Sequence, residues 1–374
     1  MTLSSRAHSR RHLVFAMIAV ALGTLVVVLL VEFVLRFLPV RESLEAPAIT
    51  AEQPQLRFRS NNEVVFSAGW DFAIVNRVRV NNFGFVNNQD YDPGQANPLL
   101  AVIGDSYVEA LMLPYQDTLH GRLAAKLGNR GRVYSFGASG SALSQYLAYA
   151  RYAEQTFRPE SMVLIVVGND FDESLLEYKA APGFHYLRGS AAKGFDLHLV
   201  PFEPSLLGRA LRWSALARYL NYNLQLSGLR RRLFGKGDYV GNVAATQESL
   251  RIQRSKEVIE YFLNVLPEYA GLAPSKIAFL VDGMRPDLYE EKALEAAQSS
   301  YFALMRTYFL QSAKAKGYVV VDMQPRFLER YHKEGKRFEW PFDGHWNSIG
   351  HEEAAKAVLS SGFLDSWISS SERK

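Results

Sequence analysis

Residues 101–110 read Ala-Val-Ile-Gly-Asp-Ser-Tyr-Val-Glu-Ala, and the rest of the chain can be placed relative to this stretch. The apolar run at 99–103 predicts a buried strand that stops at Gly104-Asp105-Ser106, and a helical apolar pattern follows. A serine on a tight strand-to-helix turn is exposed at the carboxyl edge of a sheet, beside unpaired backbone N–H groups. Such groups can hold a developing oxyanion, so Ser106 is a candidate nucleophile. The alternative interpretation is a helix-capping serine.

The segments after this stretch alternate between strands and helices. Strands are predicted at 132–136, 162–167, 276–281 and 318–321, and helices at 142–157, 255–266, 294–316 and 352–359. This alternation predicts a parallel sheet with helices on both faces, whose ligands lie at the carboxyl ends of the strands. Ser106, Gly140 and Asn169 all lie in loops that follow strands, so they are expected at that edge. Asp282 and Asp322 also end strands and are expected to cap turns.

Composition narrows the classes of function. The 374 residues carry a net charge of only +4, which does not indicate a nucleic-acid partner. There is no cysteine, which excludes disulfides, thiolate chemistry and cysteine-ligated metals. The pair His351-Glu352 begins a zinc-peptidase motif, but Ala355 occupies the place of its second histidine. No phosphate-binding loop or dinucleotide fingerprint occurs either, so we expect no cofactor and no metal.

The N-terminus is typical of a membrane anchor. Residues 1–12 contain three arginines and no acid and are expected to be a cytoplasmic tail, and 13–31 are uncharged. Glu32 and Arg36 are spaced to pair on one helix face near the interface, which extends the predicted anchor over 13–38. This single-pass topology places the remainder outside the cytoplasm, in the periplasm of a bacterium. The alternative is a cleaved signal peptide.

The remainder is expected to contain a linker, a small extension and one large domain. The linker is predicted at 39–60, a β-rich extension at 61–98, and the α/β domain at 99–365. Residues of about 178–250 break the strand–helix rhythm and read as an inserted loop-and-helix segment with several arginines, namely Arg209, Arg212, Arg218, Arg230, Arg231 and Arg232. A lid, an acidic-glycan contact or a membrane-surface contact would use these arginines. A solvated basic helix packed on the body is the interpretation that the pattern favours.

A serine needs a base to act as a nucleophile at neutral pH, and imidazole is the usual one. Asp343 and His345 are two positions apart, so in an extended segment both side chains point the same way. Asp343 can then accept a hydrogen bond from the Nδ1–H group while Nε2 faces Ser106. The N–H groups of Ser106 and Gly140, with the amide of Asn169, would form an oxyanion hole. His351 is the alternative base.

Taken in order, these motifs resemble the four blocks of the SGNH, or GDSL, hydrolase superfamily. The matching residues are Gly104-Asp105-Ser106, Gly140, Gly168-Asn169-Asp170 and Asp343-Gly344-His345, which together span about 99–360. The resemblance implies a flavodoxin-like three-layer α/β/α fold and acyl-ester chemistry. It implies Ser106, Asp343 and His345 as a catalytic triad, with Ser106, Gly140 and Asn169 as oxyanion hole. Many members space the acid and base as D-x-x-H; the shorter D-x-H found here is similar to the branch that includes periplasmic alginate O-acetylation proteins, where an N-terminal anchor is also common.

Three functions follow as expectations. The first is a membrane-anchored extracytoplasmic serine esterase that removes O-acetyl or similar short acyl groups from a carbohydrate or another small ester. The second is an O-acetyltransferase that acts on an exported polysaccharide with the same triad, which leaves room for a membrane-embedded acyl-transfer partner. The third is a non-catalytic glycan-binding or assembly subunit that keeps the fold. Tyr107, Trp213 and Trp346 could stack on a sugar, but they are expected to be packing residues.

Overall fold

The computed structural model describes residues 3–224, 226, 249–285, 287–341 and 343–368. The chain forms two compact units. The first unit comprises 1–43, 64–75 and 205–235, and the second comprises 44–63, 76–204 and 236–374. The predicted insertion is therefore divided, because 205–235 group with the N-terminal helix, whereas 178–204 and 236–250 belong to the second unit. Arg230, Arg231 and Arg232 lie outside the described residues.

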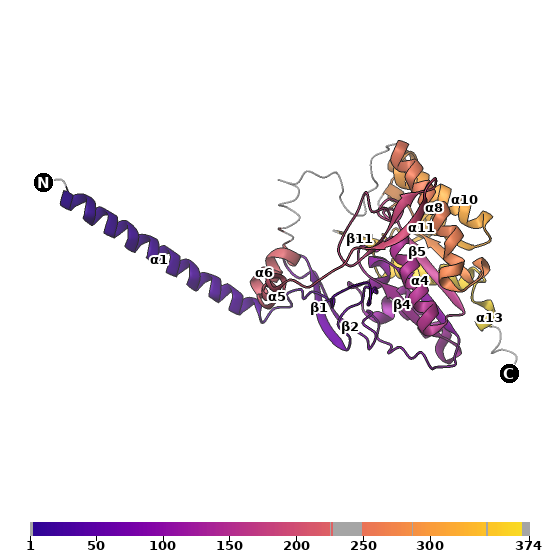
Figure 1. Cartoon of the computed structure of the whole chain (residues 1–374), viewed down its shortest axis with the longest axis horizontal. Coiled ribbons are helices and arrows are strands. Elements are labelled where there is room, and N and C mark those ends of the chain that lie inside the picture. The colour runs from indigo at the N-terminus through magenta and orange to yellow at the C-terminus, as the bar shows by residue number, and fades with distance from the viewer. Residues whose placement is uncertain (1–2, 225, 227–248, 286, 342, 369–374) are drawn as a thin grey trace. The chain divides into compact units, whose positions relative to one another are not determined.

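The second unit is built on a five-stranded sheet. Its strands are β3 (Leu99–Gly104), β4 (Arg132–Gly137), β5 (Ser161–Val166), β8 (Ile277–Val281) and β9 (Val319–Asp322). Their spatial order is β4-β3-β5-β8-β9, and every pair is parallel. Counted along the chain within this sheet, the order corresponds to the 2-1-3-4-5 arrangement of flavodoxin-like folds. The predicted parallel α/β architecture is confirmed. Figure 1 labels two of these strands, β4 and β5, and β3, which precedes Ser106, lies between them in the strand order.

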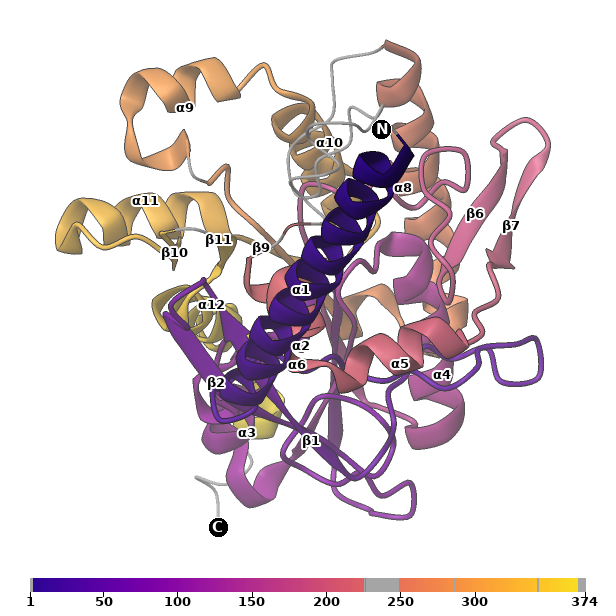
Figure 2. The same ribbon diagram turned by 90° about the vertical axis from the view of Figure 1, so that its left-hand side faces the viewer.

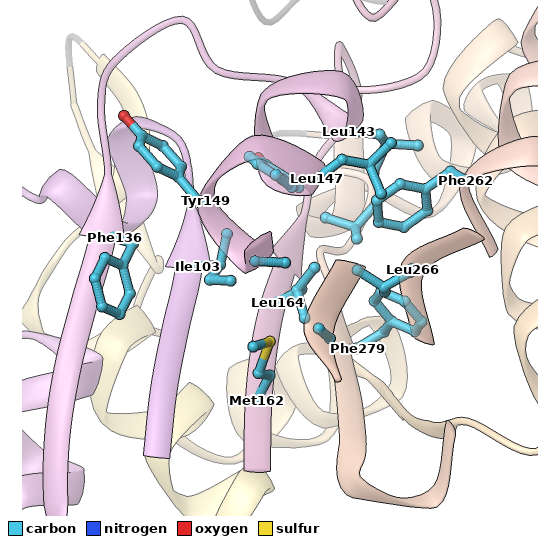
Figure 3. Packing of buried hydrophobic residues seen from close by; sticks show 14 of the residues in the cluster. Ile103, Phe136, Leu143, Leu147, Tyr149, Met162, Leu164, Phe262, Leu266 and Phe279 are labelled. Carbon is cyan, nitrogen blue, oxygen red and sulfur yellow. The ribbon is translucent and has the colours of Figure 1, made fainter. Parts of the chain in front are cut away.

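Both faces of the sheet are buried under helices. One face packs against α4 (Leu143–Phe157), α8 (Ser249–Ala270) and α10 (Tyr301–Ala315), and the other against α3 (Leu119–Leu127), α11 (Met323–Glu334) and α12 (Ser348–Ser360). Successive strand residues alternate between the two cores: Ile103 packs in the first, shown in Figure 3, and its neighbour Val102 in the second. Burial on both faces explains why the strands read as continuous apolar runs. The three-layer α/β/α prediction is confirmed.

Several shorter elements complete this unit. They are α2 (Ser106–Glu109), α9 (Glu291–Ala297), α13 (Asp365–Ile368), the single turns η1 (Tyr115–Asp117), η2 (Gly128–Arg130), η4 (Pro274–Lys276) and η5 (Asp287–Tyr289), and the antiparallel pairs β6 (His185–Ser190) with β7 (Gly194–Leu199) and β10 (Glu339–Trp340) with β11 (Asp343–Trp346). Figure 2 shows β6 and β7 as a projecting hairpin. The sequence patterns predicted neither this hairpin nor α11, because the hairpin's short strands and the polar face of α11 resemble loop composition.

Two predicted helices are divided in the structure. The helix expected after Ser106 stops at Glu109, because Ala110 adopts a positive φ of 46° and Pro114 follows. The helix predicted over 294–316 is two helices, α9 and α10. Ser300 starts the second of these by accepting a hydrogen bond from the N–H of Ala303, so the chain changes direction there.

The predicted linker at 39–60 has no regular helix or strand, yet part of it is packed. Ile49 is 1% exposed and Leu56 is 6% exposed, and both belong to the core on the α4 side of the sheet. The hydroxyl of Tyr149 donates a hydrogen bond to the carbonyl of Leu56 at 3.1 Å. This predicted linker is therefore packed at these two residues, since apolar side chains spaced along a polar segment can still be buried.

The first unit contains the apolar helix and the part of the insertion that groups with it. Helix α1 (Leu3–Leu35) includes one stretch, His12–Leu35, that is long and apolar enough to cross a membrane. The insertion contributes α5 (Leu206–Trp213), α6 (Ala215–Arg218) and a π-helical turn, η3 (Tyr219–Asn223). The predicted pair of Glu32 and Arg36 is confirmed, with Nε of the arginine 2.9 Å from the carboxylate. The strands β1 (Asn62–Ala68) and β2 (Ile74–Val80), whose residues are divided between the two units, form a two-stranded sheet, as predicted.

Candidate active site

Ser106 lies at the first position of α2, directly after the central strand β3. Asp105 caps this helix: its carboxylate accepts the N–H of Tyr107 at 2.9 Å. Gly104 permits the sharp turn, since a Cβ there would come within 2.5 Å of a methyl group of Val108. The backbone N–H of Ser106 has no acceptor among the described residues. The serine is thus presented with an unused donor beside it, as an acyl-transfer site requires.

His345 brings its ring to this serine from the far end of the sequence. Its Nε2 is 2.7 Å from Oγ of Ser106, whereas the carboxylate of Asp105 is 3.3 Å from the same oxygen. The shorter contact is the stronger hydrogen bond, so the hydroxyl is oriented to the imidazole. On the other side of the ring, Nδ1 contacts Oδ1 of Asp343, which also accepts the N–H of His345 at 2.8 Å. Serine, imidazole and carboxylate therefore form one hydrogen-bonded chain.

Because β11 is an extended strand, the short D-x-H spacing still brings the carboxylate of Asp343 to the ring of His345. Asp343 and His345 lie on the same side of this strand, as the sequence predicted from their separation. Gly344 between them turns its carbonyl to two donors, the hydroxyl of Tyr107 at 2.9 Å and Nη1 of Arg285 at 3.1 Å. A donor from the serine helix and one from the loop after β8 therefore hold the strand that carries the imidazole.

Arg285 is the centre of this support. Its side chain is 3% exposed and forms an ion pair with Asp282, with 2.6 Å between Nη2 and Oδ2. Nη2 also lies 3.1 Å from the hydroxyl of Tyr107. Asp282 in turn accepts the indole N–H of Trp346, next to His345, at 3.0 Å. Asp282 thus helps to orient the segment that carries His345, whereas Asp322 caps α11 by accepting the N–H of Gln324, as predicted.

Gly140 and Asn169 follow the two strands that flank β3, so the topology brings their loops to the serine's edge of the sheet. The N–H of Gly140 has no acceptor among the described residues, and its φ of 90° suits glycine. Nδ2 of Asn169 donates to Glu173 at 2.7 Å. Lys179 connects the two loops, because its Nζ contacts Glu173 at 2.7 Å and the carbonyl of Gly140 at 2.8 Å. Because Glu173 accepts this hydrogen bond, the donor-bearing atom of the Asn169 amide is assigned as Nδ2 at this position.

The surroundings set the charge states of the two histidines that the sequence offers as bases. Burial lowers the pKa of His345, but the hydrogen bond to Asp343 and the charges of Asp343 and Asp105 outweigh it, and the pKa is raised above its ordinary value. Burial holds the pKa of His351 well below its ordinary range. Nδ1 of His351 accepts the N–H of Leu119 at 3.1 Å, which makes it a structural residue and removes it as the alternative base.

Arg285 is a part of this site that the sequence patterns did not predict. Arg285 follows the strand-ending Asp282 by three positions, and this spacing of opposite charges was the available signal. Tyr107 and Trp346 are buried packing residues, as predicted, but both also donate hydrogen bonds within the support of β11. Trp213 is 82% exposed, so its prediction as a packing residue is wrong.

Comparisons with known proteins return likenesses of fold alone. No protein-family model matches the sequence, and no curated protein does. A lipolytic protein of the G-D-S-L family from Veillonella parvula is 12% identical, with a TM-score of 0.37 over 70% of this chain and 96% of that chain. The acetyl xylan esterase AlAXEase is 13% identical, with a TM-score of 0.39 over 70% of this chain and 98% of that one. The psychrotrophic esterase EstA from Pseudoalteromonas is 10% identical, with a TM-score of 0.38 over 73% of this chain and 100% of that one. Likenesses this weak do not establish a shared activity, so the chemistry has to be inferred from this chain's own residues.

Proposed function

We propose that the chain is a serine esterase of the SGNH type, with Ser106 as nucleophile, His345 as general base and Asp343 as the group that orients the imidazole. The observation that carries this proposal is the 2.7 Å contact between Nε2 of His345 and Oγ of Ser106, with Asp343 on the opposite ring nitrogen. An imidazole in this arrangement can take the hydroxyl proton as the oxygen attacks a carbonyl carbon.

The reaction proceeds in two halves. Oγ of Ser106 attacks the ester carbonyl, and the N–H groups of Ser106 and Gly140 with Nδ2 of Asn169 hold the negative oxygen. His345 returns the proton to the leaving alcohol, which leaves an acyl group on the serine. Water then attacks the acyl-serine, with the same imidazole as base, and releases the acid. If a sugar hydroxyl replaces water in this second half, the same residues perform acyl transfer.

The raised pKa of His345 makes the reaction dependent on pH. Only the neutral imidazole can accept a proton, so activity should fall as the pH drops through the pKa of His345. The inflection in kcat/KM should lie above the ordinary histidine value of 6.5. Asp343→Asn should move the inflection below that value, because the charge of Asp343 then no longer offsets the lowering of the His345 pKa by burial. An unchanged inflection in this variant would exclude Asp343 as the orienting acid.

The oxyanion hole is tested at Asn169. Asn169→Ala removes one donor and should lower kcat for an aryl acetate by about 10²–10³-fold, with little change in KM. Lys179→Met removes no proposed donor but frees the loop of Gly140, so a smaller fall in kcat is expected. Thermal unfolding of both variants controls for misfolding. A fall confined to KM would assign Asn169 to substrate binding instead.

The finer proposal concerns substrate and location. We infer that α1 anchors the chain with its N-terminus in the cytoplasm, because three arginines precede the apolar stretch. The second unit, which holds the proposed triad and is called the catalytic unit below, would then lie outside the cytoplasm. Exported polysaccharides carry O-acetyl groups there, and these esters are the proposed substrate. In intact cells, a membrane-impermeant thiol reagent should label a Lys292→Cys variant, since this exposed lysine lies in the catalytic unit and the chain has no other cysteine.

The decisive experiment uses the purified full chain with an aryl acetate, in the presence and absence of a polysaccharide. Free acetate and polysaccharide-bound acetate are measured separately. Release of acetate that the polysaccharide does not divert supports the esterase. Transfer that exceeds release favours the O-acetyltransferase, which resembles the alginate O-acetylation branch in its acid–base spacing. A folded chain that neither turns over the ester nor reacts with a fluorophosphonate at Ser106 would overturn both, and would favour a non-catalytic binding subunit.

A further inference from the structure

The short helices of the first unit are fastened to the end of the apolar helix. The carboxylate of Glu32, in the last turn of α1, accepts the hydroxyl of Ser214 at 2.9 Å and the N–H of Leu216 at 2.8 Å. It also accepts the N–H of Ala215 at 3.1 Å, so one side chain caps the N-terminus of α6. Figure 1 shows α6 beside the end of α1. Ala215 is fully buried against Leu35 and Val40. The segment 205–224 is therefore held against the C-terminal end of the apolar helix.

This fastened segment exposes large apolar side chains to the surroundings. In α5, Leu206 is 77% exposed and Trp213 is 82% exposed, and Leu211 between them is 51% exposed. Beyond the end of α1, Phe37 is 75% exposed. Soluble surfaces rarely gather this much apolar area in one short segment. Tryptophan in particular is enriched at the boundary between hydrocarbon and headgroups, where its amphipathic ring is best accommodated.

A hollow in the same segment mixes apolar walls with positive charge. It has a volume of about 480 Å³ and is lined by Leu211, Leu220 and Leu226 together with Arg212 and Arg218. From Glu32 onward, the described parts of the first unit carry five arginines against three acids, namely Arg36, Arg41, Arg209, Arg212 and Arg218 against Glu32, Glu42 and Asp71. Two of the acids are already paired with these arginines. A surface that is apolar and positive at once is complementary to an anionic phospholipid layer.

From these observations we propose that the segment 205–224 lies in the headgroup layer of the membrane that α1 is proposed to cross, with Leu206, Leu211 and Trp213 inserted among the lipids and anionic headgroups bound by Arg209 and Arg212. This inference rests on the proposed anchoring by α1 but not on the proposed esterase chemistry. The occupant is the bilayer itself, because the segment is joined through Glu32 to the helix that would enter it.

The chain's lack of cysteine allows a direct measurement of depth. Single-cysteine variants of the full chain at Leu206 and Trp213 are labelled with an environment-sensitive fluorophore and reconstituted into phosphatidylcholine bilayers, with or without phosphatidylglycerol. Quenching by lipids that carry a spin label near the headgroup reports an interfacial position. Ala21→Cys, in the middle of the apolar stretch, is the deep reference, and the exposed Lys292→Cys in the catalytic unit is the aqueous reference.

We expect blue-shifted emission and strong shallow quenching at Leu206 and Trp213, with an increase when phosphatidylglycerol is present. Changing Arg209 and Arg212 to glutamine should abolish that increase, whereas changing the exposed Lys333 and Lys336 of the catalytic unit should not. Two results would overturn the proposal: labels at 206 and 213 that behave like the one at Lys292, or quenching that is indifferent to both the anionic lipid and the arginines. If Ala21→Cys also reports water, the anchoring itself fails, which separates the two failures.

Discussion

Replacement of Ser106 or His345 by alanine is expected to lower kcat/KM for an aryl acetate by about four orders of magnitude or more, because either change removes the activated nucleophile. The double variant should be no worse than the more damaging single one, since the two residues act as a unit through their 2.7 Å contact. The activity that remains in these variants would come from the oxyanion donors and substrate binding alone. Steady-state kinetics on the three variants measures this lack of additivity.

Matched controls are available in the same unit. Ser299→Ala removes an exposed hydroxyl and His332→Ala removes an exposed imidazole, both away from the β11 strand, and neither should change the rate by more than about two-fold. A Ser106→Ala variant that keeps its ability to release acetate would assign the nucleophile elsewhere. Additive losses in the double variant would show that the serine and the imidazole serve different steps.

Arg285→Met is the second change with a large expected effect. It leaves the carboxylate of Asp282 buried without its cation, which typically costs about 3–5 kcal/mol of unfolding free energy. It also removes two of the hydrogen bonds that hold Gly344 and Tyr107, so the imidazole of His345 loses its fixed position. Misplacement of a reacting group by about 1 Å can cost 10²-fold in rate, and we expect a fall in kcat of that order. Urea unfolding and kinetics at a temperature where the variant stays folded measure the two effects.

A second substitution separates stability from positioning. Asp282→Asn combined with Arg285→Met removes the unpaired charge, while the amide oxygen can still accept the indole N–H of Trp346. Part of the lost unfolding free energy should return, but kcat should stay low because Gly344 still lacks its arginine donor. Recovery of kcat together with stability would reduce Arg285 to a purely structural ion pair.

Much of the fold could be predicted because burial leaves a local trace in the chain. The strand at 99–103 reads as an unbroken apolar run since its alternate residues fill two different cores. The position of Ser106 could be read from the change of period after Gly104, and the shared direction of Asp343 and His345 from their spacing. The errors occurred where the decisive contact is distant: nothing near Ile49 or Leu56 indicates the core into which they pack.

By itself, the sequence determined the apolar anchor candidate, the parallel α/β body and the residue types able to perform ester chemistry, because each depends on periodicity or composition within a short window. Only the tertiary structure decided that His345 meets a serine 239 positions away, that Arg285 supports the strand that carries His345, and that the arginine-rich insertion is fastened to α1 through Glu32. These contacts depend on how whole elements pack and on which loops close, and a local pattern carries no record of either.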